Sequence, residues 1–176
     1  MTDVIYRDIT GLLTRAQDGE PGTFEGYACV WGVQDSYGTS FRKGCFEDGG
    51  LDGEPYAYLW MHRSDEPIGT FTAKEDEHGL WVAGTYDATP DGQRARARAM
   101  SGSANGQSVG FIPLMVDPDN ETVFTQVRLV EVSQITRRMA AVPGAELTSV
   151  RANGTDSSLV VARAALALSA TEVHGE

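Results

Sequence analysis

Short apolar runs alternate with polar segments rich in glycine along most of the chain. Runs of this kind, bounded by turn-forming residues, are typical of β-strands. Residues 74–79 are charged and end in glycine, so the runs on either side of them should form a hairpin. The pattern predicts a leading strand within residues 1–22 and further strands at 23–31, 56–61, 69–73, 80–86, 107–116 and 122–136.

A central helix is predicted to begin at the segment Thr89-Pro-Asp-Gly and to reach about residue 103. Thr89 is a suitable N-cap, Pro90 fits the first helical position, and Asp91 favours the positive end of the helix dipole. With many strands and few helices, the chain is expected to be mainly β with α additions, as a barrel or a sandwich.

The remaining segments complete the expected domain organisation. One helical turn is expected within residues 41–50, whereas residues 137–150 read as irregular. Residues 1–152 are interpreted as one domain. Residues 153–176 are interpreted as a linker followed by a tail, in which an alanine-rich helix would span 157–170.

The composition is that of an ordinary globular protein, with 41% hydrophobic and 22% charged residues in a chain of 176. The 14 basic and 25 acidic residues give a net charge of −11. Because proteins that bind a nucleic-acid duplex depend on neutralising its phosphates, this sign argues against that class of function. The acidity is more simply a source of solubility.

Two cysteines, Cys29 and Cys45, are too few for a disulfide framework or a zinc site. Both are expected to be small, reduced core residues. The N-terminal residues do not resemble a signal peptide. The apolar segment 159–170 is interrupted by Arg163 and is too short to cross a bilayer, so no membrane association is expected.

Glu131 is the first candidate for chemistry, because it shares one face of a predicted strand with Leu129, Ser133 and Ile135. A carboxylate in that position is expected to face a core or a cleft, where an ionised group is costly unless it is paired. A histidine N–H is one natural partner. The alternatives are a solvent-facing strand or an ion pair with an arginine of the central helix, namely Arg94, Arg96 or Arg98.

Ser108 lies at the start of the predicted strand 107–116. Gly106 and Gly110 beside it would leave room for another backbone to approach, as a substrate would. A serine hydroxyl attacks when a neighbouring base takes its proton, whereas a small hydroxyl bonded to a carbonyl is the structural alternative. The segment fits the pattern G-x-S-x-G, but no helix follows it, which excludes a nucleophile elbow.

His62 is one of three histidines, and it closes a predicted buried strand. A side chain in that position can be held rigidly and still reach a cleft. His78 lies in the charged hairpin loop and His174 near the C-terminus. A structural histidine is the alternative for His62, while a metal ligand is disfavoured because no second His or Cys has ligand spacing.

The surroundings of these three residues resemble the sequence blocks of the phage prohead (head maturation) serine protease family, in the order of that family. The ordered set is specific, although no block is decisive alone, and it covers roughly residues 5–150. The blocks are Phe24-Glu-Gly-Tyr-Ala28 with Lys43-Gly-Cys-Phe46, Tyr58-Leu-Trp-Met-His62 with Glu66-Pro-Ile-Gly69, Glu77-His-Gly-Leu-Trp81, Asn105-Gly-Gln-Ser-Val-Gly-Phe111 and Leu129-Val-Glu-Val-Ser133.

This resemblance implies a serine endopeptidase distantly related to herpesvirus assemblins, with an assemblin-like β-barrel flanked by helices. It implies that Ser108 is the nucleophile, His62 the general base and Glu131 the residue that orients the imidazole. By the same resemblance the oxyanion donors would lie on the backbone near Arg137 and Arg138. That segment departs from the family's usual Ala-Asn-Pro sequence.

The resemblance also implies a biological setting. The substrate would be a scaffold protein or the scaffolding segment of the major capsid protein, cleaved inside the assembling prohead in the host cytoplasm. The tail 153–176 would be a region for self-cleavage. A homodimer or higher oligomer is expected, with no cofactor, metal, nucleic acid or membrane. The alternative is a catalytically silent module that keeps the protease fold and binds capsid or scaffold.

Overall fold

The computed structural model describes residues 5–9, 21–46, 51, 53–136, 139, 142–143 and 147–152. These residues form one α-helix, α1 (Pro90–Met100), and nine strands. The strands are β1 (Ile5–Ile9), β2 (Gly22–Val30), β3 (Ser40–Phe41), β4 (Tyr56–Trp60), β5 (Arg63–Glu75), β6 (Gly79–Tyr86), β7 (Gly106–Asp117), β8 (Asn120–Ile135) and β9 (Leu147–Ala152).

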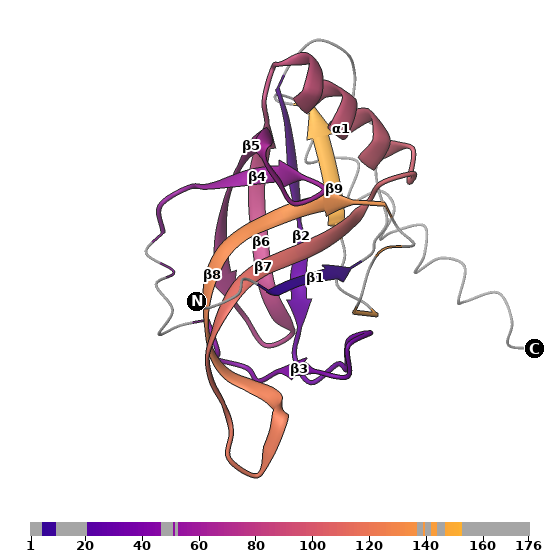
Figure 1. Ribbon diagram of the computed structural model, residues 1–176. Helices are drawn as coiled ribbons and strands as arrows, with labels where there is room; N and C mark the ends of the chain where they lie inside the picture. Colours follow the sequence, from indigo (N-terminus) through magenta and orange to yellow (C-terminus); the bar gives the residue numbers. More distant parts are fainter. Residues whose placement is uncertain are drawn as a thin grey trace, which may run out of the picture.

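All nine strands belong to one strongly curved sheet (Figure 1). Its order is β1-β7-β8-β4-β5-β6-β2-β9, and β3 pairs with β8 off this path. The two pairings of β8 with β3 and β4 are parallel, while the other pairings are antiparallel. The mainly β class with a helical addition is therefore confirmed.

In the part of the chain that the structure describes, the sheet does not close into the expected barrel. A closed barrel needs a continuous ladder between its first and last strands. Here β2 uses one edge for β6 and the other for β9, and the order runs from β1 to β9 without a pairing that joins them. The sheet is curved but open.

Aromatic side chains fill the space enclosed by the curved sheet. The rings of Phe24 and Tyr58 stack with centroids 4.2 Å apart, and Tyr58 and Tyr86 are fully buried. A buried side chain of this size contributes about 1.5–3 kcal/mol to folding by leaving water.

Cys29 and Cys45 lie in the same core, where burial raises the pKa of both thiols. Neither cysteine is therefore suited to act as a nucleophile.

Helix α1 begins as the sequence predicts. Thr89 caps it, with its hydroxyl accepting from the backbone N–H of Gly92 at 3.2 Å. The helix ends at Met100, slightly before the predicted end, and buries Ala95 and Ala99. No helix among the described residues is long and apolar enough to pass through a membrane.

The side chain of Gln134 connects β8 to α1. Its Nε2 donates to the carbonyls of Ala95 and Ala104, both at 2.7 Å, and its Oε1 accepts from the hydroxyl of Tyr86 at 2.9 Å. Gln134 is fully buried, and these three hydrogen bonds satisfy its amide. The end of β8 is therefore held at a defined position below the helix.

Three local predictions differ from the structure or lie beyond it. The helical turn expected within 41–50, after residue 44, falls mostly on residues outside the described part of the chain, and the described residues 43–46 form a turn. Part of the segment predicted as irregular, 137–150, belongs to β9, which forms because it pairs with the distant β2. The predicted C-terminal helix at 157–170 and its linker lie outside the described residues.

We predict that Gln134→Ala lowers the free energy of unfolding by about 2–4 kcal/mol, because it leaves buried polar groups without partners. Urea denaturation measures this change. Gln126→Ala serves as the matched control, because this glutamine lies on the same strand but is only partly buried. Its effect should stay below about 1 kcal/mol. Equal effects of the two substitutions would contradict the assigned role of Gln134.

Candidate active site

Strand pairing brings Ser108 and Glu131 onto one face of the sheet. In the antiparallel β7–β8 ladder Ser108 lies opposite Ser133, and Gly110 lies opposite Glu131. Residues two apart on a strand share a face, so all four positions point to the same side. The parallel β4–β8 ladder places Leu59 beside Ser133, so the end of β4 reaches this group.

His62 lies at the tip of the tight connection between β4 and β5. Trp60 pairs with Arg63, so the connection consists of Met61 and His62 alone. Both have positive φ, at 52° and 62°, as in the two-residue turns that normally favour Asn and Gly. Such backbone conformations cost about 1–3 kcal/mol each in non-glycine residues, and they are typical of functional sites. The turn is held to β8 because the N–H of Met61 donates to the carbonyl of Gln134 at 3.1 Å.

His62 and Glu131 form a hydrogen bond between Nδ1 and Oε1 at 2.8 Å. The Glu131 side chain is 8% exposed and that of His62 is 23% exposed, so the carboxylate is buried and the ring lies at the edge of the site. Because a carboxylate can only accept, Nδ1 carries the proton. In the neutral ring Nε2 is then the nitrogen with a lone pair, which a general base requires.

Of the partners that the sequence allowed for Glu131, the structure therefore shows the histidine. The three arginines of α1 have other contacts. Arg94 pairs with Asp91, Arg96 donates to Gln93 at 3.1 Å, and the guanidinium of Arg98 lies 4.8 Å from the centre of the Trp60 ring.

Gly110 makes room for the Glu131 side chain. A Cβ added to Gly110 would lie 3.0 Å from both Cγ and Cδ of Glu131 and would collide with Oε1. The prediction that Gly110 leaves space for a substrate backbone is therefore wrong, because the carboxylate fills that space. The reason is tertiary, since the register of β7 against β8 places the two residues opposite each other.

Ser108 is fully buried, and among the described residues its Oγ has no hydrogen-bond partner. The hydroxyl of Ser108 is thus not hydrogen-bonded to His62 in this structure. Buried polar atoms without a partner are uncommon, so such an atom calls for an explanation. The structure therefore brings His62 and Glu131 into direct contact and places Ser108 on the adjacent strand, facing the same side.

Ser133 is a member of the site that the sequence pattern did not single out. Its Oγ donates to Oε2 of Glu131 at 2.7 Å and accepts from the N–H of His62 at 3.0 Å. The available signal was its position two residues after Glu131 on the same strand face. Position on a face does not reveal a contact with residue 62.

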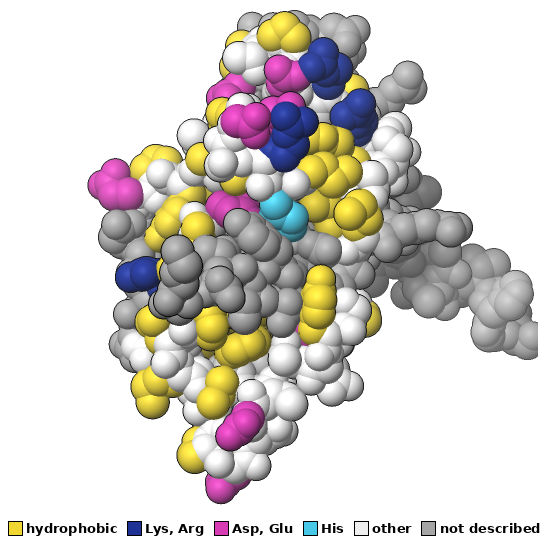
Figure 2. All heavy atoms as spheres, viewed as in Figure 1, with side chains coloured by type: hydrophobic (Ala, Val, Ile, Leu, Met, Phe, Trp, Pro, Cys, Tyr) yellow, Lys and Arg dark blue, Asp and Glu magenta, His cyan; other side chains and the backbone are white. Residues whose placement is uncertain are grey.

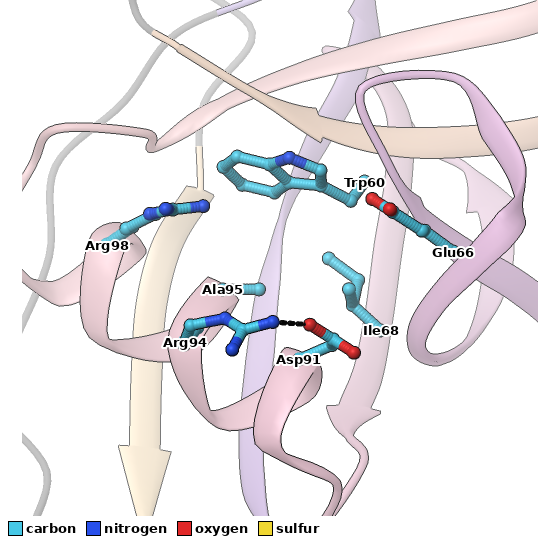
Figure 3. A pocket seen from close by; sticks show the side chains of 7 residues that line it. All are labelled: Trp60, Glu66, Ile68, Asp91, Arg94, Ala95 and Arg98. Atoms are coloured by element: carbon cyan, nitrogen blue, oxygen red, sulfur yellow. Dashed lines mark hydrogen bonds and ion pairs between the residues drawn. The ribbon is translucent and has the colours of Figure 1, made fainter.

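A pocket of about 250 Å³ lies close by, between α1 and the β4–β5 hairpin (Figure 3). Trp60 pairs in register with Gln134, so both point toward α1, away from the face of Ser133. The pocket is therefore separate from the face that carries Ser108 and Glu131. Its lining residues are Trp60, Glu66, Ile68, Asp91, Arg94, Ala95 and Arg98.

One face of the molecule combines several kinds of side chain. The space-filling view shows a histidine that reaches the surface between an apolar area and a group of basic and acidic side chains (Figure 2).

The described residues contain no group of three or more His, Cys, Asp and Glu that could hold a metal ion. Arg137 and Arg138, the residues proposed to mark the oxyanion donors, lie outside the described residues, and so does His174.

We predict that Gly110→Ala destabilises the fold by about 1–3 kcal/mol, because the new methyl group collides with Glu131. A double-mutant cycle with Glu131→Ala tests the cause, since the collision disappears when the carboxylate side chain is removed. The cost of Gly110→Ala, measured by urea denaturation, should fall below about 1 kcal/mol in the Glu131→Ala background. An unchanged cost would show that the methyl group collides with something else.

Comparison with known proteins places the chain in a family. The sequence profile of the Caudovirus prohead serine proteases matches residues 10–157. The prohead protease of Enterobacteria phage HK97 is 32% identical over 127 residues, which cover 70% of this chain and 55% of that protein. The chain thus spans about half the length of this curated relative. Because the family match covers most of the chain, including β2 to β9, the chain belongs to the Caudovirus prohead serine protease family.

Proposed function

We propose that the chain is a serine endopeptidase with a triad of Ser108, His62 and Glu131. The observation that carries the proposal is the 2.8 Å hydrogen bond between His62 Nδ1 and Glu131 Oε1. It joins two residues that are 69 positions apart, beside a strand that presents Ser108 on the same face. Membership of a serine protease family supports the same assignment.

Each residue has a defined role in the proposed reaction. Nε2 of His62 takes the proton of the Ser108 hydroxyl while Oγ attacks the carbonyl carbon of the scissile peptide bond. The resulting imidazolium is stabilised by Glu131 and protonates the leaving amine. Water then attacks the acyl-enzyme, again with His62 as base, and releases the second product and the free serine. These steps use protein groups and water alone, so the proposal requires no cofactor or metal.

The reaction requires a local change at Ser108. Its hydroxyl is buried and makes no hydrogen bond to His62 in the described structure, so it must become accessible and approach Nε2 when substrate binds. Catalytic hydrogen bonds are often long or absent without substrate and tighten in the complex. The oxyanion donors are proposed to come from the backbone near Arg137 and Arg138, as the family resemblance implies.

The proposed substrate is a scaffold protein or the scaffolding segment of the major capsid protein. The matched relative is named as a prohead protease, which supports a role in maturation of the phage head. Cleavage would take place inside the assembling prohead in the host cytoplasm, by a homodimer or higher oligomer. The segment 153–176, which follows the domain 1–152, is the proposed site of self-cleavage. No partnership with nucleic acid or membrane is proposed.

A catalytically silent module that binds capsid or scaffold is the second candidate. The observation that favours it is the buried hydroxyl of Ser108, which has no hydrogen-bond partner among the described residues. A silent module would retain the His62–Glu131 hydrogen bond as a structural contact only. The two candidates differ in whether the Ser108 hydroxyl can react.

We predict that Ser108→Ala abolishes cleavage of co-produced scaffold or capsid protein, with a loss of at least about 10³-fold and an unchanged fold. Gel analysis of the products measures cleavage, and mass spectrometry after treatment with a serine-reactive phosphonate should locate the label at Ser108. Ser103→Ala is the matched control, because this serine is exposed and should not affect activity. Unchanged cleavage in Ser108→Ala would overturn the proposed nucleophile, and an inert wild-type protein would favour the silent module.

We also predict that Glu131→Gln lowers the rate of peptide cleavage by about 10²–10⁴-fold. An amide keeps the shape of the side chain but can donate to Nδ1, which would place the ring proton on Nε2 and remove the base. Steady-state kinetics on a peptide substrate measures this loss. Glu121→Gln, at an exposed position on β8, is the control for the change of charge and should keep full activity.

A further inference from the structure

We propose that Ser133 is a positioning residue that holds both members of the His62–Glu131 pair. Its role in catalysis rests on the proposed protease function. One oxygen atom makes both contacts: Oγ donates to Glu131 Oε2 at 2.7 Å and accepts from the backbone N–H of His62 at 3.0 Å. Together with the bond between Nδ1 and Oε1, these contacts form a closed ring of three hydrogen bonds.

The first contact fixes the carboxylate. A carboxylate bonded through a single oxygen can rotate about its Cγ–Cδ bond and leave its second oxygen buried without a donor. The Glu131 residue as a whole is 6% exposed, so an unsatisfied oxygen there would be costly. By donating to Oε2, Ser133 satisfies the second oxygen and keeps Oε1 directed at Nδ1. The carboxylate is thereby held in one orientation.

The second contact fixes the histidine. Met61 and His62 both have positive φ, a conformation that persists only where surrounding contacts hold it. The hydroxyl of Ser133 is the acceptor for the N–H of His62 at the second of these positions. Ser133 therefore helps to determine where the imidazole emerges from the turn, in addition to determining where the carboxylate lies.

The same contacts argue against Ser133 as the nucleophile. Its proton is directed at the carboxylate of Glu131 rather than at the imidazole, and its oxygen already accepts from the backbone of His62. Ser108 lies opposite it on β7, and among the described residues the hydroxyl of Ser108 makes no hydrogen bond. The two facing serines thus have different proposed roles: Ser108 is the nucleophile, and Ser133 holds the His62–Glu131 pair.

The arrangement requires a donor and an acceptor on the same small side chain. Alanine provides neither, whereas threonine keeps the hydroxyl and suits a β-strand. Valine has nearly the shape of threonine but a methyl group in place of the hydroxyl. Ser133→Thr and Ser133→Val are therefore a matched pair that separates loss of the hydroxyl from a change of volume. Ser133→Ala gives the simple deletion.

The first measurement is kinetic. Ser133→Ala and Ser133→Val should lower kcat for a peptide substrate about 10–100-fold, with KM changed less than about threefold, because the triad loses alignment while substrate contacts remain. Ser133→Thr should recover most of this loss. Ser149→Ala removes another buried hydroxyl, one that accepts from Arg151 on β9, and should leave kcat unchanged.

The second measurement does not depend on proteolysis. A strongly hydrogen-bonded imidazole N–H gives a low-field proton resonance in NMR spectra, and the bond from His62 Nδ1 to Glu131 should give one in the wild-type protein. This resonance should shift or disappear in Ser133→Ala and Ser133→Val, and it should persist in Ser133→Thr and Ser149→Ala. A folded Ser133→Val protein with an unchanged resonance would overturn the proposal.

Together the two measurements separate this proposal from the proposed function. If the resonance responds to Ser133 as expected in a wild-type protein that neither cleaves peptides nor reacts with phosphonate, the protease assignment fails and the positioning role stands. If the protein cleaves but kcat is the same in Ser133→Val and wild type, the protease assignment stands and the positioning role fails. Phosphonate labelling of Ser133 in the wild-type protein would overturn the assignment of roles to the two serines.

Discussion

Burial of the Glu131 carboxylate is the constraint on which the arrangement of the site depends. Glu131 is 6% exposed, on a stretch of β8 whose two faces are both buried, and an ionised carboxylate there is costly without partners. Each carboxylate oxygen accepts a hydrogen bond: Oε1 from Nδ1 of His62 and Oε2 from the hydroxyl of Ser133. The hydrogen bonds that make the buried charge tolerable are the same ones that orient the proposed base.

The sheet supplies these donors through its registers. The parallel pairing of β4 with β8 brings the β4–β5 turn to the end of β8, where Ser133 and Gln134 receive the N–H groups of His62 and Met61. The antiparallel pairing of β7 with β8 sets Gly110 against Glu131, where a Cβ atom would collide with the carboxylate. A shift of one residue in either register would turn these side chains to the opposite face.

At the end of β8, the side chains on its two faces have different roles. Ser133 points to the proposed catalytic face, while its neighbour Gln134 points to α1 and binds two carbonyls near that helix. The fully satisfied amide of Gln134 holds the strand against the rest of the fold, so the site stands on a strand rather than on a loop. The pocket beside Trp60 belongs to the α1 side and has no part in the ring of hydrogen bonds. Gln134, which stabilises the fold, and Ser133, which belongs to the proposed site, are thus neighbours in the chain with side chains on opposite faces of the sheet.

The local sequence pattern determined several structural features of this protein. The alternation of residues predicted the β-rich class, the hairpin around 74–79 and the shared face of Glu131 and Ser133, and the cap at Thr89 predicted the start of α1, because these features depend on neighbouring residues. Family membership, suggested by the ordered blocks, is confirmed by the matched profile. Only the tertiary structure decided that Glu131 binds a histidine rather than an arginine and that Gly110 accommodates a carboxylate. It also decided that β9 pairs with β2 and that the sheet is open over the described residues. Periodicity specifies which way a side chain points, whereas the choice of partner depends on which distant strands pair and in which register.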